Sequence, residues 1–146
     1  MTDMNELKKR ISTTNEAGLI AILFERLIDN FKNCISAIEE EDYDKITGLN
    51  NNSRAILTEL TVQFSGDDEI SSTLRELYLF INKTMTEGEI KKDISSFETN
   101  IKVIMPILEG FKELEVREKP KAVAGLTYGK DNLGEYKLEE NRSFEG

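Results

Sequence analysis

The side chains best suited to chemistry are acidic and stand in two short runs. Glu39-Glu40-Glu41-Asp42 and Gly66-Asp67-Asp68-Glu69 could each offer carboxylate oxygens to a cation. However, adjacent carboxylates at a helix end point in different directions, and acidic residues at a helix start are stabilised by the helix dipole. We therefore interpret both runs as solvated helix ends, and we predict no metal site.

The other reactive groups lack the neighbours that catalysis requires. The sequence has no histidine and a single cysteine, Cys34, which excludes His-dependent triads, Glu-x-x-His di-iron sites, disulfides within the chain and zinc sites with several cysteines. Cys34 lies on an apolar helical stripe, where a small buried hydrophobic residue is expected. No glycine-rich phosphate loop is present. We predict no catalytic site and no cofactor.

Charge and length restrict the partners further. The 146 residues include 19 Lys and Arg against 28 Asp and Glu, a net charge of −9, and such a surface repels nucleic acids and anionic membranes. The basic cluster Lys8-Lys9-Arg10 is not followed by the apolar region of a secretory signal. The apolar stretch Gly18–Phe24 is too short to span a bilayer. We expect a single cytoplasmic domain without membrane insertion.

Apolar residues recur at helical spacing in four segments separated by turn signals. The first opens with a capping box, Thr13 to Glu16. Ser53 takes a core position in the second, where a small side chain lets two helices approach closely. The third is expected to stop near Gly88, and Pro106 is expected to kink the fourth. The predicted helices cover residues 13–38, 43–64, 70–88 and 94–114.

Short loops between such helices predict an all-α fold, an antiparallel up-down four-helix bundle. We expect the bundle domain over residues 13–116, preceded by a flexible N-terminal arm (1–12) and followed by a flexible C-terminal tail (117–146) rich in glycine and charge.

Every helix has apolar residues outside its core stripe. Scattered exposed hydrophobic residues are normal, but a set of them on all four helices favours a partner surface. At 100° per residue, the residues away from or flanking the stripes are Leu19, Ile22, Val62, Leu79, Phe80, Val103 and Ile107.

Four sequence blocks follow one another along the chain: Thr13–Ile20 with Leu23-Phe24-Glu25, Ile56-Leu57-Thr58-Glu59-Leu60, Leu74–Ile81 and Ile90-Lys91-Lys92-Asp93. In this order they resemble the flagellar secretion (export) chaperone FliS family. The tail Ala124–Lys130 is similar to tails of clostridial members.

The resemblance implies a cytoplasmic helical bundle that binds the disordered C-terminal segment of flagellin, prevents its premature polymerisation and passes it to the export apparatus. The flagellin segment would fold into helices on apolar grooves of the bundle. The expected partner contacts are Ile11, Leu19, Ile22, Val62, Leu79, Phe80, Val103 and Ile107.

Two other classes stay open. A regulatory or structural helical bundle could bind other proteins, or itself, through the same hydrophobic residues. An enzyme that depends on its carboxylates is the third.

Overall fold

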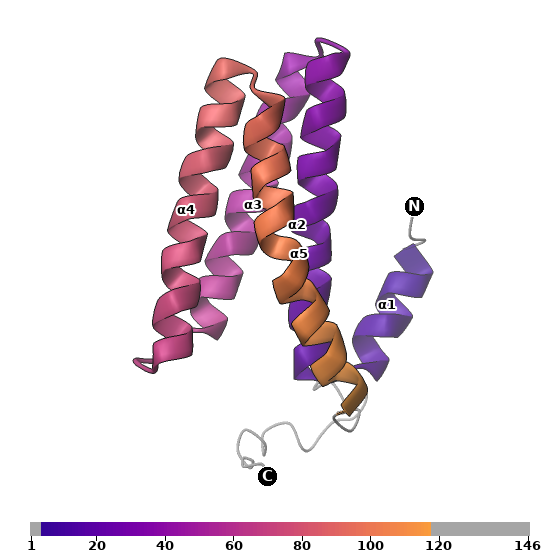
Figure 1. Cartoon of the computed structure of the whole chain (residues 1–146). Helices are drawn as coiled ribbons and strands as arrows, with labels where there is room; N and C mark the ends of the chain where they lie inside the picture. Colours follow the sequence, from indigo (N-terminus) through magenta and orange to yellow (C-terminus); the bar gives the residue numbers. More distant parts are fainter. Residues whose placement is uncertain (1–3, 118–146) are drawn as a thin grey trace. The chain divides into compact units, whose positions relative to one another are not determined.

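The computed structural model describes residues 4–117, apart from the side chains of Met4, Ser12 and Thr13. These residues form helices only (Figure 1). Most of the predicted tail (117–146) lies outside the described residues. The helices are α1 (Met4–Thr13), α2 (Glu16–Glu39), α3 (Tyr43–Gln63), α4 (Glu69–Lys91) and α5 (Ile94–Arg117).

The chain divides into two compact units, and each is described by itself. The central unit is Ile22–Glu109. The terminal unit joins the two ends of the chain, and its described residues are 4–21 and 110–117. The boundaries between the units fall inside α2 and α5.

Side-chain hydrogen bonds in the central unit define how neighbouring helices run. Between α2 and α3, Asn30 Nδ2 donates to Ser53 Oγ (3.0 Å) and Cys34 Sγ to Asn50 Oδ1 (3.6 Å). Asn50 Nδ2 also donates to the carbonyl of Met85 on α4 (3.1 Å). Because residue numbers rise on one helix as they fall on the next, α2 and α3 are antiparallel. Ser53 is fully buried, as its predicted core position requires.

The helices α3, α4 and α5 continue this alternation. Arg54 Nε donates to Asn82 Oδ1 (3.2 Å), which places residues 54 and 82 side by side on antiparallel α3 and α4. Asn100 Nδ2 on α5 donates to the carbonyl of Ile81 on α4 (3.2 Å). Gly88 lies so close to α5 that a Cβ there would fall 2.7 Å from the ring of Phe97.

Gly88 therefore serves close packing, and the third helix, predicted to stop near Gly88, runs three residues past it. The helix continues to Lys91 and ends at Lys92, which has a φ of 55°. The Asp93 N–H donates to the Gly88 carbonyl (3.0 Å) across this turn, as in a Schellman motif. The fourth helix contains Pro106 and runs on to Arg117.

The core of the central unit is made of aromatic and aliphatic side chains from all its helices. The rings of Phe31 and Phe97 lie 5.9 Å apart between centroids, and those of Phe24 and Tyr78 lie 6.5 Å apart. Phe24, Phe31 and Phe97 have no exposed surface. Each fully buried aromatic of this kind stabilises the fold by about 3 kcal/mol or more.

In the terminal unit, the junction between α1 and α2 is held by Glu115 of α5. Its Oε2 accepts from Thr14 Oγ1 (2.6 Å), its carbonyl accepts from Asn15 Nδ2 (2.9 Å), and its Oε1 lies 3.7 Å from Arg10. Gly18 leaves room for this cluster, because a Cβ there would fall 1.8 Å from Thr14 Oγ1.

Two predictions for this region are corrected. The predicted flexible arm contains the helix α1 over most of its length. The second helix begins at Glu16, not at Thr13, because the Asn15 side chain accepts from the Gly18 N–H (2.9 Å) and so caps it.

Candidate functional site

The single cysteine of the chain is not placed to act as a nucleophile. Cys34 is fully buried, and desolvation, with a smaller effect of the Glu89 charge, raises the pKa of its thiol to about 12. A thiol with that pKa is protonated and unreactive near neutral pH. Within residues 4–117, no group of acidic or sulfur side chains is placed to hold a metal ion.

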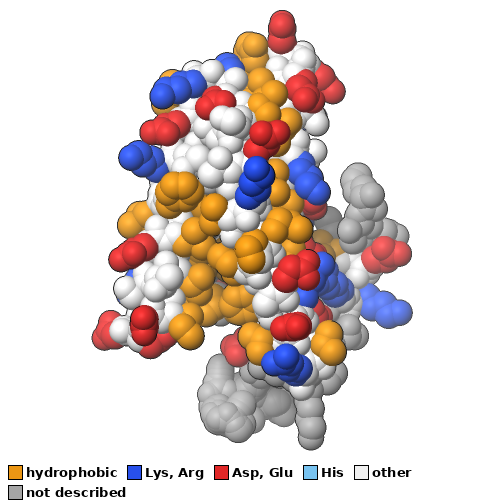
Figure 2. Space-filling view, in the orientation of Figure 1, with side chains coloured by type: hydrophobic (Ala, Val, Ile, Leu, Met, Phe, Trp, Pro, Cys, Tyr) orange, Lys and Arg blue, Asp and Glu red, His pale blue; other side chains and the backbone are white. Residues whose placement is uncertain are grey.

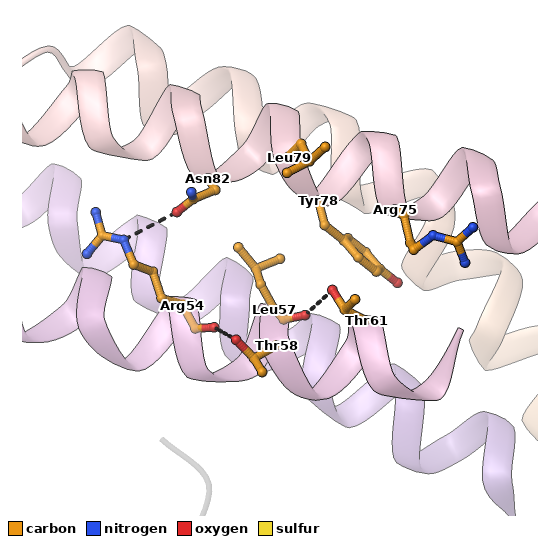
Figure 3. A pocket seen from close by; sticks show the side chains of 8 residues that line it. All are labelled: Arg54, Leu57, Thr58, Thr61, Arg75, Tyr78, Leu79 and Asn82. Carbon is orange, nitrogen blue, oxygen red and sulfur yellow. Dashed lines mark hydrogen bonds between the residues drawn. The ribbon is translucent and has the colours of Figure 1, made fainter. Parts of the chain in front are cut away.

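The candidate site is a groove between α3 and α4 with a volume of about 450 Å³. Arg54 and Asn82 are hydrogen-bonded across it at one end (Figure 3). Four residues of each helix line it, namely Arg54, Leu57, Thr58, Thr61, Arg75, Tyr78, Leu79 and Asn82.

The middle of the groove is apolar. Leu57 and Tyr78 are buried, whereas Leu79 has 71% of its surface exposed. Thr61 offers little polarity, because its hydroxyl donates to the Leu57 carbonyl of its own helix (2.8 Å). An exposed leucine beside buried apolar side chains is suited to contact another apolar surface.

Tyr78 is the least satisfied polar residue of the groove. The residue is 3% exposed, and its hydroxyl has no hydrogen-bond partner in the described part of the chain. Burial raises the pKa of the phenol, which stays neutral. Leaving such a hydroxyl unpaired costs about 1–3 kcal/mol.

Arginines occupy both ends of the groove. Arg54 Nη2 donates to Thr86 Oγ1 (2.9 Å) on α4. Arg75 Nη1 donates to the carbonyls of Phe64 (2.8 Å) and Gly66 (2.7 Å), just beyond the end of α3. Figure 3 shows the two guanidinium groups pointing away from each other, with the apolar residues between them.

Some of the predicted contact residues are exposed on the central unit. Leu79 lines the groove, Val62 on α3 is 62% exposed, and Phe80 on α4 is 45% exposed. Val103 and Ile107 are half-buried and lie one turn apart on α5. Figure 2 shows hydrophobic side chains gathered over α4 and the middle of α5.

The remaining predicted contact residues, Ile11, Leu19 and Ile22, are not exposed on the central unit. Ile11 and Leu19 are half-buried in the terminal unit. Ile22 is only 4% exposed, so the prediction that it faces away from the core is wrong. The stretch around it is apolar on all sides, and such a helix is buried on all sides. Ile22 belongs to the core.

Other residues of the exposed surface are missing from the sequence prediction. Ile70 fits the core stripe of its helix by spacing, but it is 67% exposed. With residue 54 beside residue 82, residue 70 falls opposite residue 66, beyond the end of α3, so α3 does not cover it. The groove arginines and Tyr78 are also missing from the prediction, because their significance comes from pairing α3 with α4.

The described chain is thus a helical protein with an apolar groove between two arginines, a surface suited to contact another protein. Flagellar protein FliS is the family whose model matches residues 2–118. The chain belongs to this family of flagellar export chaperones, whose members bind flagellar proteins. No curated protein matches the sequence. In residues 4–117, the helices are too short or too polar to cross a membrane.

Proposed function

We propose that this protein is an antiparallel up-down four-helix bundle that acts in the cytoplasm as the export chaperone of flagellin. It binds the disordered C-terminal segment of flagellin, prevents premature polymerisation and delivers the segment to the export apparatus without a catalytic step. The observation that carries the proposal is the exposed Leu79 in the groove between α3 and α4.

The proposed contacts follow the exposed and half-buried hydrophobic residues. A flagellin segment would form amphipathic helices as it covers them, since a bundle groove accepts a helix through its apolar face. The contacts proposed for the segment are Ile11, Leu19, Val62, Leu79, Phe80, Val103 and Ile107.

Folding upon binding also accounts for release. A disordered client loses conformational entropy when it becomes helical, which lowers the net affinity for a given contact area. The complex can therefore be both extensive and reversible. Transfer to the export apparatus then requires only a competing surface, with no nucleotide hydrolysis.

Titration calorimetry and circular dichroism with a flagellin C-terminal peptide test the proposal together. We expect a one-to-one complex at micromolar concentration or below, with more helical signal than the sum of the separate components. A scrambled peptide of the same composition is the control and should give neither signal. No heat and no gain in helix with the native peptide would refute the proposal.

Light scattering of the protein alone separates the alternative class. A self-associating structural bundle should increase in mass with concentration in the absence of peptide. The proposed chaperone should keep the same mass over the range in which it binds peptide.

A further inference from the structure

The two arginines of the groove are spaced along its axis. Arg54 on α3 lies beside Asn82 on α4, and Arg75 precedes Asn82 by seven residues on that helix. Seven residues are about two turns, or about 10 Å. The charges lie further apart than these helix positions, because Arg54 reaches on to Thr86 while Arg75 reaches the carbonyls of Phe64 and Gly66 beyond the end of α3. Figure 3 shows the two guanidinium groups pointing away from each other.

Arg54 is held by neutral groups. Nη1 donates to Asn51 Oδ1 (3.1 Å), Nε to Asn82 Oδ1 (3.2 Å) and Nη2 to Thr86 Oγ1 (2.9 Å). These three contacts fix the guanidinium at the groove rim without neutralising it. The charge of Arg54 also acts through space on Glu89: burial raises the pKa of that carboxyl, but hydrogen bonds from Asn50 and Thr47 and the charges of Arg54 and Lys92 lower it on balance.

Arg75 is also held by neutral groups, the carbonyls of Phe64 and Gly66. Its charge is felt weakly by Asp68, whose pKa is lowered mainly by its hydrogen bonds to Ser71. Among the described residues, neither Arg54 nor Arg75 forms an ion pair. In a chain with a net charge of −9, one groove thus carries two cations that are held in place by neutral hydrogen-bond partners.

The surface between the cations is apolar, with Leu57 and Tyr78 buried and Leu79 exposed. The groove therefore has a positive end, an apolar middle and a second positive end. A helix of complementary pattern would carry an acidic side chain, an apolar patch and a second acidic side chain, with the acidic residues about three turns apart.

From this charge complementarity we propose that the groove between α3 and α4 selects amphipathic client helices that carry acidic side chains on both sides of their apolar patch. The inference rests on the proposed function, because it specifies which segment of a client enters this groove. Leu79 and Leu57 bind the apolar patch, while Arg54 and Arg75 each bind one carboxylate and fix the register of the helix.

A designed peptide pair tests the charge requirement on the wild-type protein. Both peptides are 18-residue amphipathic helices with the same apolar face. One has Glu and the other Gln at two positions 11 residues apart that flank this face. Fluorescence anisotropy should show the Glu peptide binding about 5- to 10-fold more tightly, since each partly exposed charge pair contributes up to about 5-fold. Equal affinities would overturn the inference.

A double variant assigns the effect to the groove. R54Q/R75Q keeps hydrogen-bonding side chains and should lose the preference for the Glu peptide, while its affinity for the Gln peptide changes less than 2-fold. The matched control R26Q/K32Q removes two exposed charges of α2 and should keep the preference. The assignment would be contradicted if R54Q/R75Q lost affinity equally for both peptides. It would also be contradicted if R26Q/K32Q lost the preference for the Glu peptide. If R54Q/R75Q does not fold, the peptide pair still decides the question on the wild type.

Titration of the flagellin C-terminal segment separates the two proposals. If flagellin binds and the designed peptides do not differ, the inference fails and the proposed function stands. If the Glu peptide is preferred and flagellin does not bind, the groove inference stands and the choice of client is wrong. A dimer of the free protein that is abolished by R54Q/R75Q would overturn the inference in favour of a second copy.

Discussion

The helices α2 and α4 use their apolar residues in opposite ways. Of the two, α2 is the richer in apolar side chains, yet none of its large hydrophobic residues is exposed. α4 is less apolar overall, yet it exposes four of them, Ile70, Leu79, Phe80 and Ile90. The amount of apolar side chain on a helix does not determine how much is left for a partner.

The turn that precedes each residue differs. Ile22 has Gly18 and Leu19 on that turn, a small and an apolar residue that allow close packing. Leu79 has Arg75 and Glu76 on that turn, whereas both residues are followed one turn later by polar residues. Because the polar side chains around Leu79 keep this face of α4 in contact with water, Leu79 is exposed as well.

Ile22→Asp should produce the largest effect on stability. The substitution removes a buried aliphatic side chain and places an unpaired charge in the core, which together should lower the free energy of unfolding by about 4 kcal/mol or more. Chemical denaturation measures this change. Ile22→Leu is the control and should cost less than about 1.5 kcal/mol. A stable Ile22→Asp protein would mean that α2 also exposes this face.

Leu79→Asp should leave the fold intact and weaken client binding. We expect a free energy of unfolding within about 0.5 kcal/mol of the wild type. The affinity for the flagellin segment should fall about 10-fold, since one buried leucine contact is worth about 1.5 kcal/mol or more.

Ile90→Asp is the matched control, because Ile90 is as exposed as Leu79 on the same helix but does not line the groove. The affinity of the Ile90→Asp variant for the flagellin segment should change less than 2-fold. Equal losses in the two variants would show that the exposed face of α4 acts as a whole and that the groove has no special role.

Much of the fold could be predicted from the sequence because helix periodicity is strong in α2 to α5. Their limits match the predicted ones within a few residues. The packing role of Gly88 could not be predicted, because it depends on the Phe97 ring of another helix. α1 could not be predicted, because a helix of ten residues is marginal by itself. Of the residues that line the candidate groove, the sequence predicted only Leu79 as a contact. Arg54, Arg75 and Tyr78 could not be predicted, because their roles depend on the pairing of α3 with α4.

The ends of the two helices sharpen the comparison. The turn after α2 places Glu41 at a φ of 59°, where glycine has no steric penalty. Glu41→Gly should therefore raise the free energy of unfolding by about 1 kcal/mol. At the end of α4, Lys92→Gly should gain less, because Lys92 Nζ donates to the Glu89 carbonyl (2.8 Å) and lies 5.0 Å from the centre of the Tyr43 ring.

Thermal melts of the two variants measure this difference. Glu40→Gly is the control for the first, since Glu40 is not a positive-φ residue, and it should not stabilise. A larger gain for Lys92→Gly than for Glu41→Gly would contradict the stabilising role given to the Lys92 contacts.

The starts of the two helices should differ in their response to acid. The cap of α2 is the uncharged Asn15, whereas the cap of α4 is Asp68, whose pKa is lowered mainly by hydrogen bonds from Ser71. A lowered pKa means that the stabilisation is present above the ordinary carboxyl pKa of 3.8 and is lost as the pH falls through the folded value below it.

Asp68→Asn keeps a capping side chain without the titration. The acid-induced loss of stability below pH 3.8 should therefore be smaller in this variant than in the wild type, as followed by denaturation at a series of pH values. Asp29→Asn, at an exposed position within α2, is the control and should leave the acid response unchanged. An unchanged response in Asp68→Asn would show that the cap does not contribute to it.

Backbone amide NMR of the protein titrated with the flagellin C-terminal segment tests the central claim most directly. The account predicts that the largest shift changes fall on residues 54–61 and 75–82, which line the groove between α3 and α4, while the amides of residues 24–34 in α2 change little. Large changes confined to other helices, with the α3 and α4 amides unmoved by saturating segment, would contradict it.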